Sequence, residues 1–313
     1  MRDFKVGLWL VVAAVCLASG CERKQEAKEA DRLTARARIL EDQVDSLSQA
    51  VAVYRQVAGR FPDLPAGREA QDRGDRLARV EEAYRQTGRT VTGDSAVILF
   101  SKRVLAIAPD YRPAIRRLGG LYHNQIDFAA QFAASPLGHN LGLMNQAWSL
   151  WKDQDSLWTH YQFRPLHDDR EWGDRLCRSS QVVANMLSKY DRYRDALATV
   201  ERGLAYAGTD GETARAKVYA AYYRFWVKDF DRTTKLAQEA LDSGLLEKPE
   251  KAKAYHAQGM GYAYLFMDSR KADDLDRSIK ALNESIQIEP KNEAARDLLK
   301  AMREARVKLG VMP

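Results

Sequence analysis

One pattern of residue spacing recurs along this chain and restricts the folds that the chain can adopt. Its clearest copy is formed by Ala50, Tyr54, Val57 and Pro62. Intervals of three and four residues place the first three side chains on one face of a helix, and a proline then ends the helix. Repetition of such a unit predicts a stacked array of helices, because one unit alone cannot bury its apolar face. Two further copies, with conservative and then looser changes, are Ser278, Leu282, Ser285 and Pro290, and Val97, Ser101, Val104 and Pro109.

A second pattern combines a glycine with aromatic and apolar residues. It occurs as Tyr255, Gln258, Gly259 and Tyr262, and again as Ile115, Leu118, Gly119 and Tyr122. Together the two patterns resemble the two helices of a tetratricopeptide repeat. In that family the glycine lets the helices approach closely, and the aromatic side chains fill the space beside it.

The resemblance covers most of residues 45–300, although two repeats are degenerate and lack the closing proline. It implies an all-α fold, a right-handed superhelix of tetratricopeptide-like helix pairs, and a scaffold that presents a groove to a protein or peptide. The degenerate second helices contain Ala196, Val200 and Gly203, and Thr233, Ala237 and Ala240.

The remaining sequence also favours an all-α fold. Apolar residues recur every three or four positions, period-two alternation is absent, and only nine prolines occur in 313 residues. A continuous apolar stripe from Leu33 to Tyr54 predicts one long helix over residues 30–59. Thr209 and Glu212 have the spacing of a capping box, which predicts that a helix begins there.

The N-terminus has the pattern of a secretory signal peptide. Arg2 and Lys5 precede an apolar run over residues 6–17, and three small residues follow it. A run of about twelve residues is too short to span a bilayer core, which needs about 20 in a helix. We therefore expect residues 1–20 to be removed and no transmembrane span to remain.

The end of this signal resembles a bacterial lipobox. The run Leu17-Ala18-Ser19-Gly20-Cys21 places small residues before a cysteine, although the leucine lies one position earlier than usual. The resemblance implies that Cys21 is lipidated and becomes the mature N-terminus, whereas an ordinary cleaved signal with a chance cysteine is the alternative. Glu22 in place of an aspartate favours the outer membrane, with the protein facing the periplasm.

Cysteine content and charge exclude several other classes of protein. Once Cys16 and Cys21 are removed or lipidated, Cys177 has no partner for an intramolecular disulfide, and we expect a buried, inert thiol. The 49 basic and 43 acidic residues are interleaved along the chain, which is typical of solvated helix faces and not of a nucleic-acid surface. Nucleic acid is therefore not an expected partner.

One segment also resembles a more specific group of proteins. Residues 50–65, AVAVYRQVAGRFPDLP, are similar to a repeat of periplasmic lipoproteins that assemble outer-membrane proteins. The similarity covers one repeat only. It favours an envelope assembly or maintenance complex without identifying one.

The repeat pattern is lost between residues 132 and 179. This stretch is rich in tryptophan and histidine, and three interpretations remain open: a self-packed insertion, a partner or ligand surface, or a metal site. The metal site would combine the three histidines with Asp168 or Asp169, but no two of the histidines have the close spacing usual for zinc ligands. The residues concerned are Trp148, Trp151, Trp158, Trp172, His139, His160 and His167.

No familiar catalytic signature occurs in the sequence. Gly259-Met260-Gly261 has the look of a phosphate loop but lies inside a helical pattern, where small residues serve packing. We therefore expect no enzyme activity, no cofactor and no metal, although an enzyme of unrecognised type would require clustered titratable residues in the insertion.

These observations combine into one set of predictions. The chain comprises a signal peptide (residues 1–20), a lipidated tether (21–32), N-terminal repeat-like helices (33–131), the insertion (132–179) and C-terminal repeats (180–308). It is a membrane-anchored periplasmic scaffold for a protein or peptide; the alternative is a lipoprotein that binds a small ligand or transport substrate at residues 139–172. The predicted partner-binding residues are Arg116, Arg117, His123, Trp148, Trp151, Trp158 and Arg224.

Overall fold

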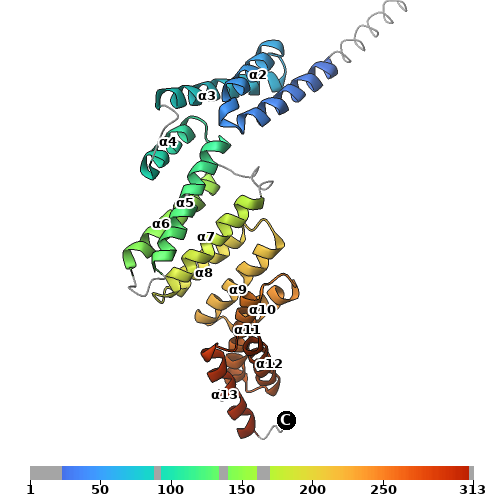
Figure 1. Cartoon of the computed structure of the whole chain (residues 1–313). Helices are drawn as coiled ribbons and strands as arrows, with labels where there is room; N and C mark the ends of the chain where they lie inside the picture. The colour runs from blue at the N-terminus through green and yellow to red at the C-terminus, as the bar shows by residue number, and fades with distance from the viewer. Residues whose placement is uncertain (1–22, 88–92, 134–139, 161–169, 310–313) are drawn as a thin grey trace, which may run out of the picture. The chain divides into compact units, whose positions relative to one another are not determined.

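The structure is a computed structural model that describes residues 23–87, 93–133, 140–160 and 170–309. Within these ranges the chain forms helices and short connections and contains no strand, which confirms the all-α prediction. None of the helices in these ranges combines the length and apolar character needed to cross a bilayer. A helix over residues 23–41 comes first (Figure 1). It is followed by the 3₁₀ turn η1 (Val44–Ser46) and by α2 (Leu47–Arg60), α3 (Pro65–Thr87), α4 (Asp94–Ile107), α5 (Arg112–Ala133), α6 (Leu141–His160), α7 (Arg170–Ser188), α8 (Tyr193–Leu204), α9 (Asp210–Trp226), α10 (Phe230–Asp242), α11 (Lys248–Ser269), α12 (Ala272–Ile288) and α13 (Glu293–Lys308).

The chain divides into two compact units, Met1–Leu121 and Tyr122–Pro313, which we call unit 1 and unit 2. The boundary falls inside α5. The predicted signal peptide and the lipidation site Cys21 lie outside the described residues. Residues 23–32 of the predicted tether are helical, and Ala30 is buried.

Unit 1 corrects the prediction of one long helix over residues 30–59. The first helix ends at residue 41, Gln43 is extended (φ −115°, ψ 114°), and α2 begins at Leu47. Arg60 Nη1 lies 2.8 Å from Glu29 Oε1, whereas in one continuous helix residues 31 apart would be about 45 Å apart. The turn folds the two halves of the apolar stripe against each other, which buries both halves, whereas a single straight helix would leave much of the stripe in water.

A buried ion pair joins the elements of unit 1. The Arg73 guanidinium on α3 contacts the carboxylates of Glu41 and Asp110, and Tyr54 Oη on α2 donates a 2.9 Å hydrogen bond to Glu41. The side chains of Arg73 and Glu41 are only 11% and 7% exposed. One arginine thus links the first helix, α3 and the turn after α4.

Unit 2 consists of consecutive helix pairs in α7 to α13. α7 packs on α8, α9 on α10 and α11 on α12, while α7, α9, α11 and α13 also contact one another in series. Each of α7, α9 and α11 is followed by one non-glycine residue with left-handed backbone: Asp191 (φ 57°), Lys228 (φ 66°) and Arg270 (φ 58°). The first two turns also share one hydrogen bond, from the Arg192 N–H to the Leu187 carbonyl and from the Asp229 N–H to the Arg224 carbonyl, which supports repetition of one structural unit.

Contacts between α11 and α12 confirm the predicted repeat positions there. An added Cβ at Gly259 would lie 2.7 Å from Leu282 Cγ, so the glycine permits this close approach. Ser278 Oγ donates to the Gly259 carbonyl and Ser285 Oγ to the Ala252 carbonyl, each at 2.9 Å. The glycine therefore serves helix packing, as predicted, and is not part of a phosphate loop.

The stretch expected as an insertion is also helical where it is described. It contains α6 and the first part of α7, and α7 continues through the boundary expected at residue 179. α6 packs on α7, and its Met144, Ala147 and Trp151 share a core with Val183 and Leu187. This part of the stretch is thus built onto the core of unit 2.

Candidate interaction surfaces

The predicted contact residues are distributed over both units. Arg116 and Arg117 lie in unit 1, where Arg117 hydrogen-bonds the Tyr84 hydroxyl, and the other described residues lie in unit 2. His123 Nδ1 lies 2.7 Å from Ser179 Oγ, and its Nε2 lies 3.4 Å from Asp127. Burial lowers the pKa of His123, which favours the neutral ring in this packed position.

The tryptophans of α6 differ in their surroundings. Trp151 is buried in the core and is a packing residue. Trp148 is half-buried, with Lys152 Nζ 3.4 Å and the Arg192 guanidinium carbon 4.0 Å from its ring centroid. The Trp158 side chain lies outside the described part of the structure. Of the three, Trp148 is therefore the one shown at the surface, between two cations.

The histidines of the considered metal site cannot be placed. His139, His167 and the His160 side chain lie outside the described residues, as do Asp168 and Asp169. Among the side chains that are described, no cluster of three or more histidine, cysteine, aspartate or glutamate residues is placed to hold a metal ion.

Arg224 has a different environment from the one predicted for a contact residue. Its Nε donates to Glu201 at 3.0 Å, and its Nη1 lies 2.8 Å from Asp229. The guanidinium thus ties α9 to α8 and to the turn before α10. Its two carboxylate partners assign it to holding adjacent helix pairs together.

A line of ion pairs crosses α7, α9 and α11, the first helix of each pair in unit 2. Arg178 on α7 lies 2.7 Å from Glu212 on α9, and Arg215 on α9 lies 2.6 Å from the same carboxylate. Arg215 Nε also lies 3.3 Å from Glu250 on α11. Glu212 is buried between the two arginines, whereas half of the Arg178 side chain is exposed. The charges therefore fix three helices in register and leave cationic groups at the surface.

Lys253 on α11 continues this surface toward two tyrosines of α9. Its Nζ lies 4.0 Å from the ring centroid of Tyr219 and 5.2 Å from that of Tyr222, an arrangement that favours a cation. Burial nevertheless lowers the pKa of Lys253 to about 8. We call Arg178, Glu212, Arg215, Tyr219, Tyr222, Glu250 and Lys253 the first-helix surface.

The sequence did not predict this surface as a whole. Glu212, Arg215 and Tyr219 follow one another at intervals of three and four residues on α9, so the pattern was available. Their partners Arg178 and Glu250 lie more than thirty residues away along the chain, and no spacing rule within one helix pairs them. The capping box at Thr209, by contrast, is local and is confirmed: its side chain accepts from the Glu212 backbone N–H.

The thiol of Cys177 on α7 is not activated for catalysis. Cys177 is buried, and burial raises the pKa of its thiol to about 12, so the thiolate needed for attack is scarce at neutral pH. The prediction of a buried, inert thiol is confirmed. The ion pairs of the first-helix surface join helices to one another and do not place a base beside a nucleophile.

The chain matches no model of a known protein family. It also matches no curated protein. A search of solved structures finds the tetratricopeptide-repeat domain of P58(IPK), with 14% sequence identity, a TM-score of 0.33, and coverage of 88% of this chain and 78% of that one. The helix pairs of unit 2 are shown by the contacts of this chain itself.

Proposed function

We propose that this protein is a non-enzymatic scaffold that binds a protein or peptide partner along the first-helix surface of unit 2. The observation that carries the proposal is the alignment of arginine, tyrosine and lysine side chains across α7, α9 and α11. These are the first helices of three consecutive pairs, and they contact one another in series. Tyrosine and arginine contribute much of the energy of protein interfaces. Helices that are packed in advance lose little further freedom on binding, which favours affinity.

The surface suits an extended, acidic or mixed-charge segment. Arg178 and Lys253 supply cations at its two ends, whereas Glu212 is already neutralised by Arg178 and Arg215. A partner carboxylate could pair with either cation without exposing a buried charge, because Glu212 keeps Arg215 as its second partner.

The binding proposal can be tested with matched alanine variants. Arg178→Ala and Lys253→Ala should each weaken recovery of a cross-linked partner from native membranes by about thirtyfold, the loss that corresponds to an interface hot spot of about 2 kcal/mol. Lys235→Ala on α10 and Lys280→Ala on α12 remove exposed charges from second helices and should have no effect. Equal losses in both sets, or none in the first, would contradict the assignment to the first-helix surface.

We further propose that the scaffold is anchored in the bacterial envelope through a lipid on Cys21, facing the periplasm from the outer membrane. The support is the apolar run, the lipobox-like residues before Cys21 and Glu22 after it. A single acyl chain binds a membrane only marginally, whereas several hold firmly. Cys21→Ala should therefore abolish palmitate labelling and give soluble protein or uncleaved precursor; labelling that persists would refute the anchor.

A further inference from the structure

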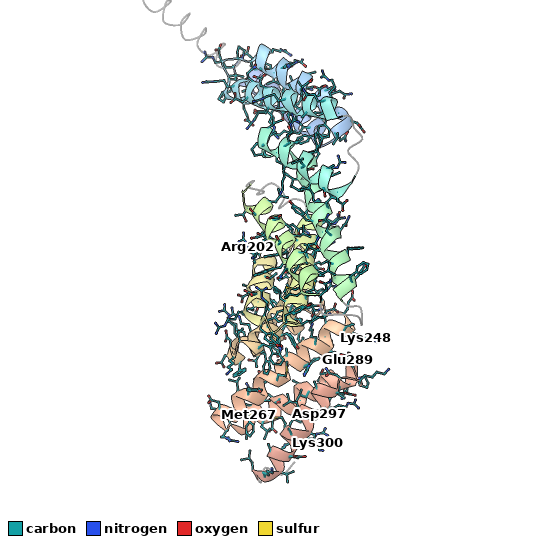
Figure 2. All side chains as sticks on the ribbon, turned by 90° about the vertical axis from the view of Figure 1, so that its left-hand side faces the viewer. Arg202, Lys248, Met267, Glu289, Asp297 and Lys300 are labelled. Carbon is teal, nitrogen blue, oxygen red and sulfur yellow. The ribbon has the colours of Figure 1, made fainter. Side chains whose placement is uncertain are left out.

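A cavity of about 430 Å³ opens in unit 2 outside the first-helix surface. It lies between two equivalent turns: residues 191–195, where α7 passes into α8, and residues 226–228, where α9 passes toward α10. This volume falls in the range of sites that hold a side chain or small ligand. Aromatic residues also pack next to Trp226: Tyr264, near the C-terminal end of α11, packs on Phe225 and Phe230. Figure 2 shows Met267 and Lys248 at opposite ends of α11.

One wall of the cavity is aromatic and rigid. The rings of Tyr193 and Trp226 stack with centroids 4.8 Å apart and an interplanar angle of 11°. Trp226 is nevertheless 43% exposed, although tryptophan is usually well buried. The stack fixes the Trp226 indole from one side. The indole therefore loses little further side-chain freedom when a ligand covers its exposed part.

The charges at the cavity are unevenly satisfied. Arg192 pairs with Asp195 at 2.6 Å and lies over the Trp148 ring, and Asp191 accepts a 3.1 Å hydrogen bond from Tyr193 Oη. Within the described ranges, Arg194 and Lys228 form no ion pair. The lining holds three cations, Arg192, Arg194 and Lys228, against two carboxylates, Asp191 and Asp195, so the excess of positive charge beside the exposed indole complements an acidic ligand.

We propose that this turn pocket binds an acidic peptide segment of a partner protein. An aromatic side chain of the segment packs against Trp226, and carboxylates beside it pair with Arg194 and Lys228. The hollow between the two turns is open to solvent, so a peptide side chain can enter it, and the vesicle arm of the test distinguishes the peptide from an anionic membrane. The pocket and the first-helix surface use different residues, so the two sites are independent, and one partner that occupied both would gain avidity.

The test uses the full chain labelled with 5-fluorotryptophan and observed by fluorine NMR. Single tryptophan-to-phenylalanine variants assign the resonances. The probes are the capped peptides Asp-Glu-Phe-Asp-Glu, Lys-Lys-Phe-Lys-Lys and Asp-Glu-Ala-Asp-Glu. The first should shift the Trp226 resonance saturably, and the second should not shift it. The third should bind at least about tenfold more weakly than the first, because it lacks the ring that packs on the indole.

Charge-reversal variants distinguish binding of the acidic peptide at this pocket from its nonspecific attraction to basic residues elsewhere. Lys228→Glu should weaken the first peptide by about tenfold or more, whereas Lys300→Glu on α13 makes the same charge change away from the pocket and should not (Figure 2). Thermal unfolding of both variants confirms that they fold. The proposal is overturned if the peptide shifts no resonance, if it shifts other tryptophans and not Trp226, or if both charge variants weaken it equally. It is also overturned if phosphatidylglycerol vesicles shift Trp226 while the peptide does not.

Discussion

Arg73 shows how single residues hold unit 1 together. Its guanidinium is almost fully buried, and removal of a charge from water is costly unless partners replace the lost hydration. Glu41 and Asp110 supply that replacement, and Tyr54 binds Glu41 in turn. The arginine is therefore tied to structure and is not a candidate for binding a ligand.

This environment predicts a large effect for one arginine and a small effect for another. Arg73→Ala should destabilise unit 1 by about 3 to 5 kcal/mol, because it leaves Glu41 buried without its cation. Arg38→Ala removes a similar ion pair with Glu69, but both side chains are more than half exposed, and we expect a loss below about 1 kcal/mol. Urea unfolding of both variants compares them directly, and similar losses would contradict the burial of Arg73.

The lowered pKa of Lys253 predicts that the stability of the fold depends on pH. Burial lowers the pKa of its amine in the folded protein to about 8, below the usual value of 10.5. Between about pH 8 and about pH 10.5 the unfolded chain binds more protons at this site than the folded chain, so this residue makes stability rise with pH in that window. Lys253→Met lacks the penalty for a buried ammonium, so its stability relative to wild type should be highest below pH 8 and should shrink as the pH rises. A difference in urea midpoint that stays constant from about pH 7 to about pH 9.5 would exclude this titration.

At the residue scale, a role that depends on local spacing could be predicted from the sequence, whereas bonds to distant partners could not. Thr209 caps α9 as predicted, since its acceptor and donor are three residues apart. Arg224 was predicted as a contact residue, and its hydrogen bond to Glu201, 23 residues away, was not predicted, because helical periodicity does not indicate such a pair. The contrast between buried Trp151 and cation-flanked Trp148 likewise depends on helices far along the chain.

At the scale of elements, the close packing of α11 on α12 depends on Gly259. An added methyl group there would lie 2.7 Å from Leu282 Cγ and 3.3 Å from the Leu282 backbone nitrogen, so the helices must separate. Gly259→Ala should therefore cost about 1 to 3 kcal/mol by overpacking. Gly211→Ala in α9, where nothing lies within 4 Å of the added atom, is the matched control and should be neutral or stabilising by up to about 1 kcal/mol.

Thermal or urea unfolding of the two glycine variants decides between packing and flexibility. If Gly259 served only to make the helix pliable, both alanine variants would stabilise the protein to a similar extent. Opposite signs support the close contact of α11 with α12 that the repeat resemblance implies.

The helical state of the elements was predicted from the sequence, but the residues at which some helices begin and end were not. The stripe from Leu33 to Tyr54 fits one helix as well as two, because helical periodicity does not reveal a turn that preserves the face on both sides. The structure turns at residues 42–46, and the pairing of Glu29 with Arg60 is what distinguishes the two arrangements. Such a pairing is a tertiary interaction, which a pattern along the chain cannot specify.

At the scale of the whole molecule, unit 2 carries the features expected of a binding scaffold. Its first helices contact one another in series, and its equivalent turns recur after α7, α9 and α11. This arrangement was predictable, because repeated spacing along the sequence translates directly into repeated packing. The first-helix surface was not predicted as a whole, since its charges are paired between repeats and not within them.

Site-specific photo-cross-linking in the native cell tests whether a partner lies along α7, α9 and α11 of unit 2. A photoreactive phenylalanine analogue replaces Tyr219 and Tyr222 on α9 and the exposed Asn185, seven residues after Arg178 and on the same face of α7; Lys235 on α10 and Lys280 on α12 are the control positions. We predict that light captures the same partner protein from the three first-helix positions and not from the second-helix controls. Capture from all positions alike, or from the controls alone, would contradict the proposed function.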